Sequence, residues 1–390
     1  MAEAKHENRA HALLSASGAS RWMNCTPSAR LEETFEDSGT SDFAAEGTLA
    51  HEFGEAFLKA YIEGPATVPN TCALVGHRLY TNDMEGEVDK YVDYVVESFE
   101  VAKKTTKDAV LLIEQKVDLT DYIENGFGSD DAIIVADGTL TVIDLKYGKG
   151  IRVNADENSQ LKLYGLGTLR QFEMMYDIHT VKLVIVQPRL DHVSEWEISA
   201  SDLLAWGEKE VRPKAKLAYA GGGIQISGEW CKWCKVKGRC ATLAANNLKI
   251  AKDAFSEKPD PHLLTDAQLL EVYHKIDQIS DWINAVDSYL LSEAVKGKKW
   301  AGLKLVEGKS NRVWSDVEKV QETLSSLGYE KDEYLNSKLA GLGDIEKLVG
   351  KAKFPVILGD LIIKPQGKPT LVPLSDKRAE FSSAKKDFAE

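Results

Sequence analysis

The chain has 390 residues, enough for two or three domains, and its 61 acidic residues exceed its 48 basic ones, giving a net charge of −13. This charge argues against a protein that coats nucleic acid electrostatically, although an enzyme that contacts DNA through a local groove remains compatible with it. No apolar run approaches the roughly 20 residues of a membrane span, and the N-terminus lacks the apolar core of a signal peptide. We therefore expect a cytoplasmic protein with reduced cysteines and no membrane partner.

Hydrophobic periodicity predicts an α/β region preceded by helices. Residues 1–14 are polar and expected to be flexible, and helices are predicted over residues 15–35, 46–64 (with Thr48 as N-cap) and 85–104. The pattern then changes to strands at 109–119, 130–148, 181–190 and 194–200, with helices at 156–176 and 199–219. This succession predicts an α/β domain with a mixed central sheet over residues 15–255.

The pair Asp137–Gly138 between apolar runs predicts a tight β-hairpin. In a two-residue turn at this pair, Asp131 lies directly opposite Asp144, and Lys146 points to the same face as Asp144. Opposed like charges destabilise a sheet, and a divalent cation between the two carboxylates would reverse that effect. The alternative is that one aspartate faces solvent.

A carboxylate–x–lysine element facing a second carboxylate suits phosphodiester hydrolysis. A metal ion there polarises the phosphate and generates hydroxide, while Lys146 orients water or steadies developing charge. His51 lies on a predicted helix and is a weak signal by itself, because a lone helical histidine is usually structural. Gln160 and Tyr164 are four residues apart and share a helix face.

Three of the five cysteines, Cys231, Cys234 and Cys240, lie within ten residues and can bind one metal centre. Either Cys25 or Cys72 could complete a set of four. Both zinc and a [4Fe–4S] cluster use four thiolates, and the spacing does not separate them.

After a linker at residues 256–262, a long amphipathic helix and an α+β region are expected up to residue 373, followed by a mobile tail over 374–390. The segment from 296 to 314 is rich in cations, including Lys299 and Arg312, and carries two tryptophans. It is a candidate DNA-contact surface, with a solvated face as the alternative.

These elements together resemble the RecB-like branch of the PD-(D/E)XK nuclease superfamily, its iron–sulfur members (the AddB-type nucleases and the CRISPR-associated RecB-like exonucleases), and a phage-encoded family. The motifs occur in the same order: "GTLAH" at 47–51, a carboxylate strand with Glu114, "GSDD" at 128–131, "DLK" at 144–146, and Gln160 with Tyr164. One cysteine precedes this core and three follow it, as in the iron–sulfur members.

The resemblance implies a restriction-endonuclease-like core and a role for each motif residue. The implied metal ligands are His51, Asp131, Asp144 and the Leu145 carbonyl. Lys146 would be catalytic, with Asp131 favoured over Asp130 by register and family spacing. The residues implied to support the site or hold DNA are Glu114, Gln160 and Tyr164. Cys25 would be the fourth cluster ligand, closing an iron–sulfur clasp around the core.

The expected function is a Mg²⁺- or Mn²⁺-dependent DNA exonuclease acting on DNA ends in phage replication or recombination, in the bacterial host cytoplasm. Phage single-strand-binding or recombination proteins are expected partners. One alternative is a catalytically silent DNA clamp stabilised by the [4Fe–4S] cluster. A third is a zinc-bound interaction protein.

Overall fold

The computed structural model describes residues 12–35, 41–64, 72–256, 265–336, 338–351 and 353–381. It forms two compact units, Met1–Asp281 and Trp282–Glu390, which divide inside helix α10 (Asp266–Val295). Most of the linker expected at 256–262 lies outside the described residues. Each unit is considered by itself below.

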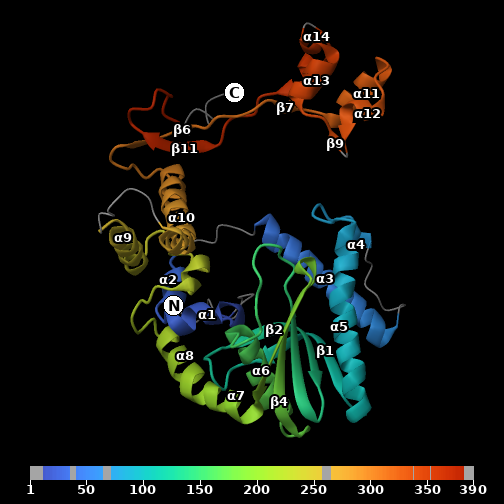
Figure 1. Cartoon of the computed structure of the whole chain (residues 1–390), viewed down its shortest axis with the longest axis vertical. Helices are drawn as coiled ribbons and strands as arrows, with labels where there is room; N and C mark the ends of the chain where they lie inside the picture. Colours follow the sequence, from blue (N-terminus) through green and yellow to red (C-terminus); the bar gives the residue numbers. More distant parts are fainter. Residues whose placement is uncertain are drawn as a thin grey trace. The chain divides into compact units, whose positions relative to one another are not determined.

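The first unit is built on a five-stranded mixed sheet with the strand order β1-β2-β3-β4-β5 (Figure 1). The strands are β1 (Val110–Asp118), β2 (Phe127–Val135), β3 (Gly138–Leu145), β4 (Ile178–Gln187) and β5 (His192–Ser199). Neighbouring strands are antiparallel except β3 and β4, which are parallel and joined through helix α6 (Ser159–Phe172). This arrangement confirms the predicted α/β class with a mixed sheet.

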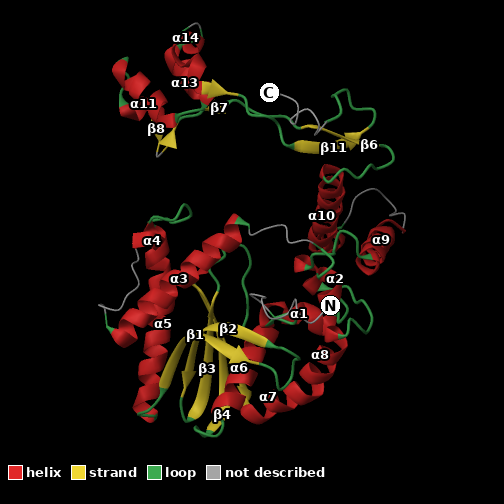
Figure 2. Cartoon of the chain, turned by 180° about the vertical axis from the view of Figure 1, so that it is seen from behind, coloured by secondary structure: helices red, strands yellow, loops and turns green. Residues whose placement is uncertain are grey.

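Helices cover both faces of this sheet (Figures 1 and 2). Helices α3 (Asp42–Glu63) and α5 (Asp83–Thr105) pack on one face, and α6, α7 (Ala200–Trp206) and α8 (Arg212–Tyr219) pack on the other. Strand residues alternate between the two cores, so Val142 joins the α6 side and Ile143 the α5 side. The central strands are therefore covered on both faces, whereas the edge strand β5 exposes every second residue from Val193 to Glu197.

Two local expectations were wrong. The single helix predicted over 15–35 is two short helices, α1 (Ala19–Asn24) and α2 (Ser28–Glu32), preceded by a 3-10 turn at Ala16–Gly18. Pro27 explains the break, because it has no N–H and disfavours helical backbone in the residue before it. Helix α3 begins at Asp42, capped by the Ser41 hydroxyl, which accepts a hydrogen bond from the Ala44 N–H at 3.2 Å, and not at Thr48.

Several short elements complete the first unit. They are α4 (Cys72–Val75), a 3-10 turn at Pro188–Leu190, a π-helical turn at Gly207–Val211 between α7 and α8, a 3-10 turn at Glu229–Trp233 and α9 (Ala241–Ser256). The Glu229–Trp233 turn carries the first of the three clustered cysteines.

The second unit is α+β, as predicted for the C-terminal region. Its paired strands are β6 (Leu303–Glu307) with β11 (Pro369–Pro373), β7 (Val313–Trp314) with β10 (Ile362–Ile363), and β8 (Leu335–Asn336) with β9 (Lys338–Leu339). Its helices after α10 are α11 (Val317–Ser326), α12 (Lys331–Tyr334), α13 (Leu342–Val349) and α14 (Phe354–Leu358), followed by a 3-10 turn at Gly359–Leu361. These helices share one apolar core.

Candidate metal centre and cysteine cluster

The β2–β3 hairpin has the predicted register. The recorded pairs run from Val135 with Leu140 to Ala132 with Ile143, as a two-residue turn at 137–138 requires. Gly138 has a φ of 82°, a conformation that side chains with a Cβ rarely adopt, which explains the glycine at this turn. The recorded pairing stops one residue before Asp131 and Asp144.

The sheet becomes irregular at that point. Glu114 of β1, which stands opposite Asp131, has a φ of 46°, and the pairs on either side of it are regular. The Asp131 carboxylate leaves the alternating pattern: its Oδ1 lies 2.8 Å from His51 Nδ1 on α3, and its Oδ2 accepts a hydrogen bond from the Leu145 N–H at 2.6 Å. A left-handed non-glycine residue costs on the order of 1–3 kcal/mol, and such strain clusters at functional sites.

Asp144 reaches the same end of the sheet from the other face. Its Oδ1 accepts a hydrogen bond from Gln160 Nε2 on α6 at 2.9 Å, whereas Asp131 contacts α3. The prediction that both carboxylates lie side by side on one face is therefore corrected. Asp131 contacts His51 of α3, whereas Asp144 contacts Gln160 of α6.

One group of three side chains has the spacing of a cation site within the described residues. Ligand atoms of His51, Glu114 and Asp131 all lie within 4.8 Å of one another. Burial lowers the pKa of His51, but the Asp131 carboxylate outweighs it and raises that pKa to about 9. Burial, together with Asp131, raises the pKa of Glu114 to about 7. Glu114, expected only to support the site, is thus a candidate ligand.

Lys146 lies against Asp144 at the same end of β3. Its Nζ is 2.8 Å from Asp144 Oδ2 and 3.1 Å from Oδ1, and it donates to Gln160 Oε1 at 3.2 Å. Of the two Asp144 oxygens, only Oδ1 accepts a hydrogen bond from Lys146, and Oδ2 interacts with the ammonium as an ion pair without hydrogen-bond geometry. Burial lowers the pKa of Lys146, but the nearby carboxylates, Asp144 first, raise it above its ordinary value. The ammonium is therefore charged.

Gln160 and Tyr164 share a helix face, as predicted, and Gln160 Nε2 lies 3.4 Å from the Tyr164 hydroxyl. Gly128 on β2 makes room for this tyrosine, because a Cβ there would lie 2.6 Å from the Tyr164 ring. The glycine of the "GSDD" motif is thus a packing requirement of the site.

Asp130 is the residue that sequence reasoning set aside. Its side chain is completely buried (0% exposed), and neither carboxylate oxygen has a hydrogen-bond partner. Burial first, then the neighbouring Asp131 and Asp144, raise its pKa well above the ordinary value. Only side-chain alternation in a correctly placed strand could have signalled this burial.

The four predicted cluster cysteines line one small cavity. Cys25, Cys231, Cys234 and Cys240 surround a space of about 20 Å³ together with apolar side chains and a few polar ones, Arg21 and Lys237 among them. All four are free thiols. Cys25 caps the end of α1 at the break before Pro27, so the interrupted helix aims it at the other three. The side chain of Cys72 lies outside the described residues.

The cavity suits thiolate ligands. Backbone N–H groups of Gly228 and Leu243 donate to the sulfur atoms of Cys231 and Cys240 at 3.5 Å each. Burial raises the pKa of the Cys234 thiol to about 12, so an ionised sulfur here needs a cationic partner. Among these described cysteines, no three sulfur atoms come within 4.8 Å of one another.

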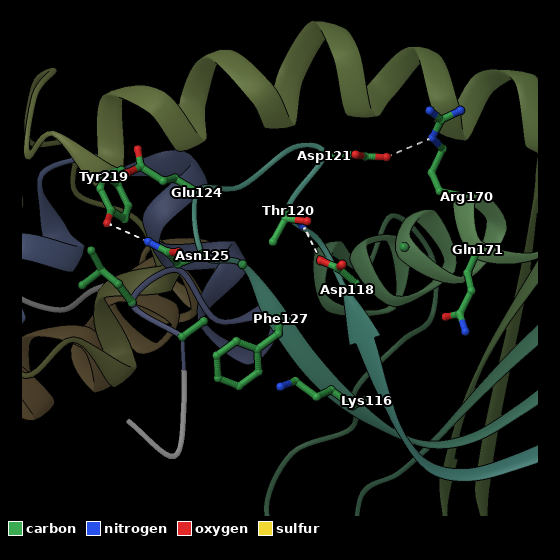
Figure 3. Close-up of a pocket in the computed structure, with 14 residues that line it drawn as sticks. Lys116, Asp118, Thr120, Asp121, Glu124, Asn125, Phe127, Arg170, Gln171 and Tyr219 are labelled. Atoms are coloured by element: carbon green, nitrogen blue, oxygen red, sulfur yellow. Dashed lines mark hydrogen bonds and ion pairs between the residues drawn. The ribbon is translucent and has the colours of Figure 1, made fainter. Parts of the chain in front are cut away.

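A separate cavity of about 820 Å³ lies beyond the start of β2 (Figure 3). It is lined by residues of both charge signs, and Asp121 pairs with Arg170 across it. None of the predicted site residues lines it. One of its lining residues, Phe127, is adjacent in the sequence to Gly128, which contacts Tyr164 of the candidate centre.

The C-terminal basic stretch is only partly available. Lys299 and Arg312 are exposed, as a DNA contact requires. Lys304, in contrast, donates hydrogen bonds to the backbone carbonyls of Asp376 and Arg378, at 2.6 and 2.7 Å. Trp314 packs edge-on against Phe354 in the core of the second unit.

Residues 376–381, expected in a mobile tail, contact strand β6 through these bonds and through Phe381 N–H to Leu305 O at 2.6 Å. Residues 382–390 lie outside the described residues.

Within the described residues, no helix combines the length and apolarity needed to cross a bilayer.

Comparisons with known proteins identified a family and a weakly similar solved structure. A solved structure described as "Crystal structure of SSO0001" is similar at 15% sequence identity, over 56% of this chain and 95% of that chain, with a TM-score of 0.22, too low to carry an argument. The family model described as "Protein of unknown function (DUF2800)" matches residues 11–379, and the chain belongs to this family.

Proposed function

We propose that the protein is a divalent-metal-dependent DNA nuclease with a PD-(D/E)XK core, acting on DNA ends in phage replication or recombination. The observation that carries the proposal is the convergence of His51, Glu114, Asp131, Asp144 and Lys146 at one irregular end of the sheet. A protein that needed this region only for packing would not gather several carboxylates around one half-buried ammonium.

The donor set fits a hard divalent cation. The candidate ligands are His51, Asp131 and Asp144, with Glu114 and the Leu145 carbonyl beside them. Asp144 Oδ2 has no hydrogen bond although it is buried. Burial, together with Asp131, raises the pKa of Glu114. Burial also raises the pKa of Asp144, although the Lys146 ammonium acts to lower it. Mg²⁺ or Mn²⁺ bound among these carboxyl groups would favour their ionised forms, and binding through His51 would require its neutral imidazole. Bound there, such an ion would polarise the scissile phosphate and lower the pKa of a water.

The chain's own residues supply positioning and charge. The Lys146 ammonium is held by Asp144 and Gln160, so it points at a fixed place beside the carboxylates and can steady negative charge on a phosphate oxygen. Gln160 in turn bonds Asp144 and contacts Tyr164, which fixes the carboxylate's orientation. Asp131 orients the His51 imidazole through their 2.8 Å contact.

The four cysteines are proposed to hold a [4Fe–4S] cluster. Tetrahedral zinc, with Zn–S bonds of about 2.3 Å, brings its thiolates to roughly 3.8 Å from one another. Four cysteines lining one cavity also match the four thiolates of a [4Fe–4S] cluster, in which each thiolate binds a different iron. Joining Cys25 to residues more than 200 positions later would stabilise the fold by on the order of 4–5 kcal/mol if it acts as a cross-link.

The test is incubation of anaerobically purified protein with end-labelled linear DNA and with circular DNA, in Mg²⁺, in Mn²⁺ and in EDTA. We expect metal-dependent loss of linear DNA and intact circles. Asp144→Asn should abolish cleavage, and Asp93→Asn, an exposed change on α5, is the matched control. Equal cutting of circles would refute exonuclease action, and binding without cutting would favour a DNA clamp.

A further inference from the structure

The loop between Lys146 and Gln160 displays an unusual combination of side chains. Residues 148–152 are all exposed, and they present Lys149, Ile151 and Arg152 shortly after β3 and the proposed catalytic lysine, Lys146. Ile151 is 51% exposed, in a loop with two cations close by in sequence. Ile151 therefore places an exposed aliphatic side chain beside two exposed cations.

The base of this loop is fixed by a buried side chain. Gln187, 1% exposed at the end of β4, accepts a hydrogen bond from the Val153 N–H at 2.7 Å and donates one to the Ile151 carbonyl at 3.0 Å. The Ala155 N–H donates to the Ser194 hydroxyl at 3.0 Å. The backbone that carries Ile151 is therefore held in place, so the exposure of its side chain is built into the fold.

The loop cations also differ from their neighbours. Arg189 pairs with Glu46 at 3.0 Å and stacks on the Tyr147 ring, so its charge is used internally. In the part of the chain that the structure describes, Lys149 and Arg152 have no ion-pair or hydrogen-bond partner. Two unpaired cations near the candidate centre of a chain with net charge −13 favour a polyanionic partner.

We propose that this loop, residues 148–152, grips the end of duplex DNA, an inference that rests on the proposed nuclease function. Lys149 and Arg152 contact backbone phosphates, and Ile151 packs against the terminal base pair and opens it. Their spacing of three residues spans at most roughly 10–11 Å, within reach of nearby phosphates on one strand. Apolar side chains inserted between base steps unstack them in this way, with cations holding the adjacent backbone. The separated strand is then delivered to Lys146.

Binding is measured with the full chain carrying Lys146→Ala, which keeps the proposed metal ligands, on blunt duplex DNA at several salt concentrations. Lys149→Ala with Arg152→Ala should lower the slope of log Kd against log salt by about 1.8, because each lost phosphate contact removes about 0.9. The matched control is Lys104→Ala with Lys107→Ala. These exposed lysines flank Thr106, whose hydroxyl bonds the Asp137 N–H at the opposite end of β3, so the slope should not change.

Ile151→Ala tests the wedge separately. With 2-aminopurine in the terminal base pair, binding of the parent protein should raise the fluorescence, and Ile151→Ala should remove that rise while leaving the salt slope unchanged. In the cleavage-competent chain, Ile151→Ala should slow digestion of blunt duplex at least tenfold relative to single-stranded DNA. Thermal unfolding checks that the exposed substitutions leave the fold intact.

The outcomes separate this inference from the function on which it rests. A wild-type chain that neither binds nor cuts any DNA would refute both. A wild-type chain that cuts DNA, with loop variants matching it in salt slope, fluorescence and substrate preference, would refute the loop's role alone.

Discussion

Two buried aspartates in the candidate site should respond in opposite ways to removal of their charge. Asp130 is 0% exposed with no hydrogen-bond partner, and Asp144 is 3% exposed against the Lys146 ammonium. From the sequence alone, replacing Asp144 is expected to relieve repulsion and leave the metal-free protein no less stable. The structure reverses that expectation, because it gives Asp144 a cationic partner and gives Asp130 none.

Asp144→Ala should destabilise the metal-free protein by about 3 kcal/mol. Breaking a buried ion pair by removing one partner costs roughly 3–5 kcal/mol, since the remaining charge stays buried and uncompensated. The Lys146 side chain is 30% exposed and keeps Gln160 as an acceptor at 3.2 Å, so we expect the lower end of that range.

Asp130→Asn should have a pH-dependent effect of the opposite sign. The folded pKa of Asp130 is raised by burial, so the native state holds a proton that the unfolded chain releases above about pH 4. A raised carboxyl pKa means that stability falls as pH increases above the unfolded value. Relative to Asp130→Asn, the wild type should therefore lose about 1.4 kcal/mol per pH unit until Asp130 ionises in the folded state.

The assay is denaturant unfolding in EDTA at pH 5, 6, 7 and 8 for wild type, Asp130→Asn, Asp144→Ala and the control Asp93→Asn. The control should match the wild type at each pH. A pH-independent difference between wild type and Asp130→Asn would show that Asp130 is ionised in the folded protein, and the assigned burial effect would be wrong. An Asp144→Ala protein as stable as wild type would show that the Lys146 pair contributes nothing.

Three further predictions follow from the site. Lys146→Ala should retain Mn²⁺ binding, measured by calorimetry, but lose cleavage by at least a hundredfold; loss of both would make Lys146 a structural residue. Cys25→Ser should give colourless protein with a lower iron content than the wild type, measured by visible absorption and metal analysis. Stoichiometric zinc without iron in the wild type would overturn the cluster assignment. Lys299→Ala with Arg312→Ala should lower the salt slope of DNA binding by up to about 1.8 if both contact phosphates, and an unchanged slope would remove the basic stretch from the DNA surface.

Much of the sheet could be predicted from the sequence because its signals are local. Apolar runs located the strands, and the Asp137–Gly138 turn set the hairpin register, since turn length and side-chain alternation act over a few residues. The same locality explains one of the errors. Pro27 interrupts the predicted first helix through its own backbone chemistry, which a search for helical periodicity overlooked.

The contacts and the burial of the charged residues are determined by the tertiary structure. Asp131 contacts His51 of α3 next to the left-handed Glu114, an arrangement that strict side-chain alternation does not anticipate. From the sequence, only family resemblance indicated that Cys25 joins the other three cysteines. In the structure, chain segments about 200 residues apart meet at one cavity that all four cysteines line. Burial, and hence the pKa of Asp130, depends on what packs over a side chain from distant elements. Residue order fixes local conformation, but the environment of each charge is set by contacts between segments far apart in the chain.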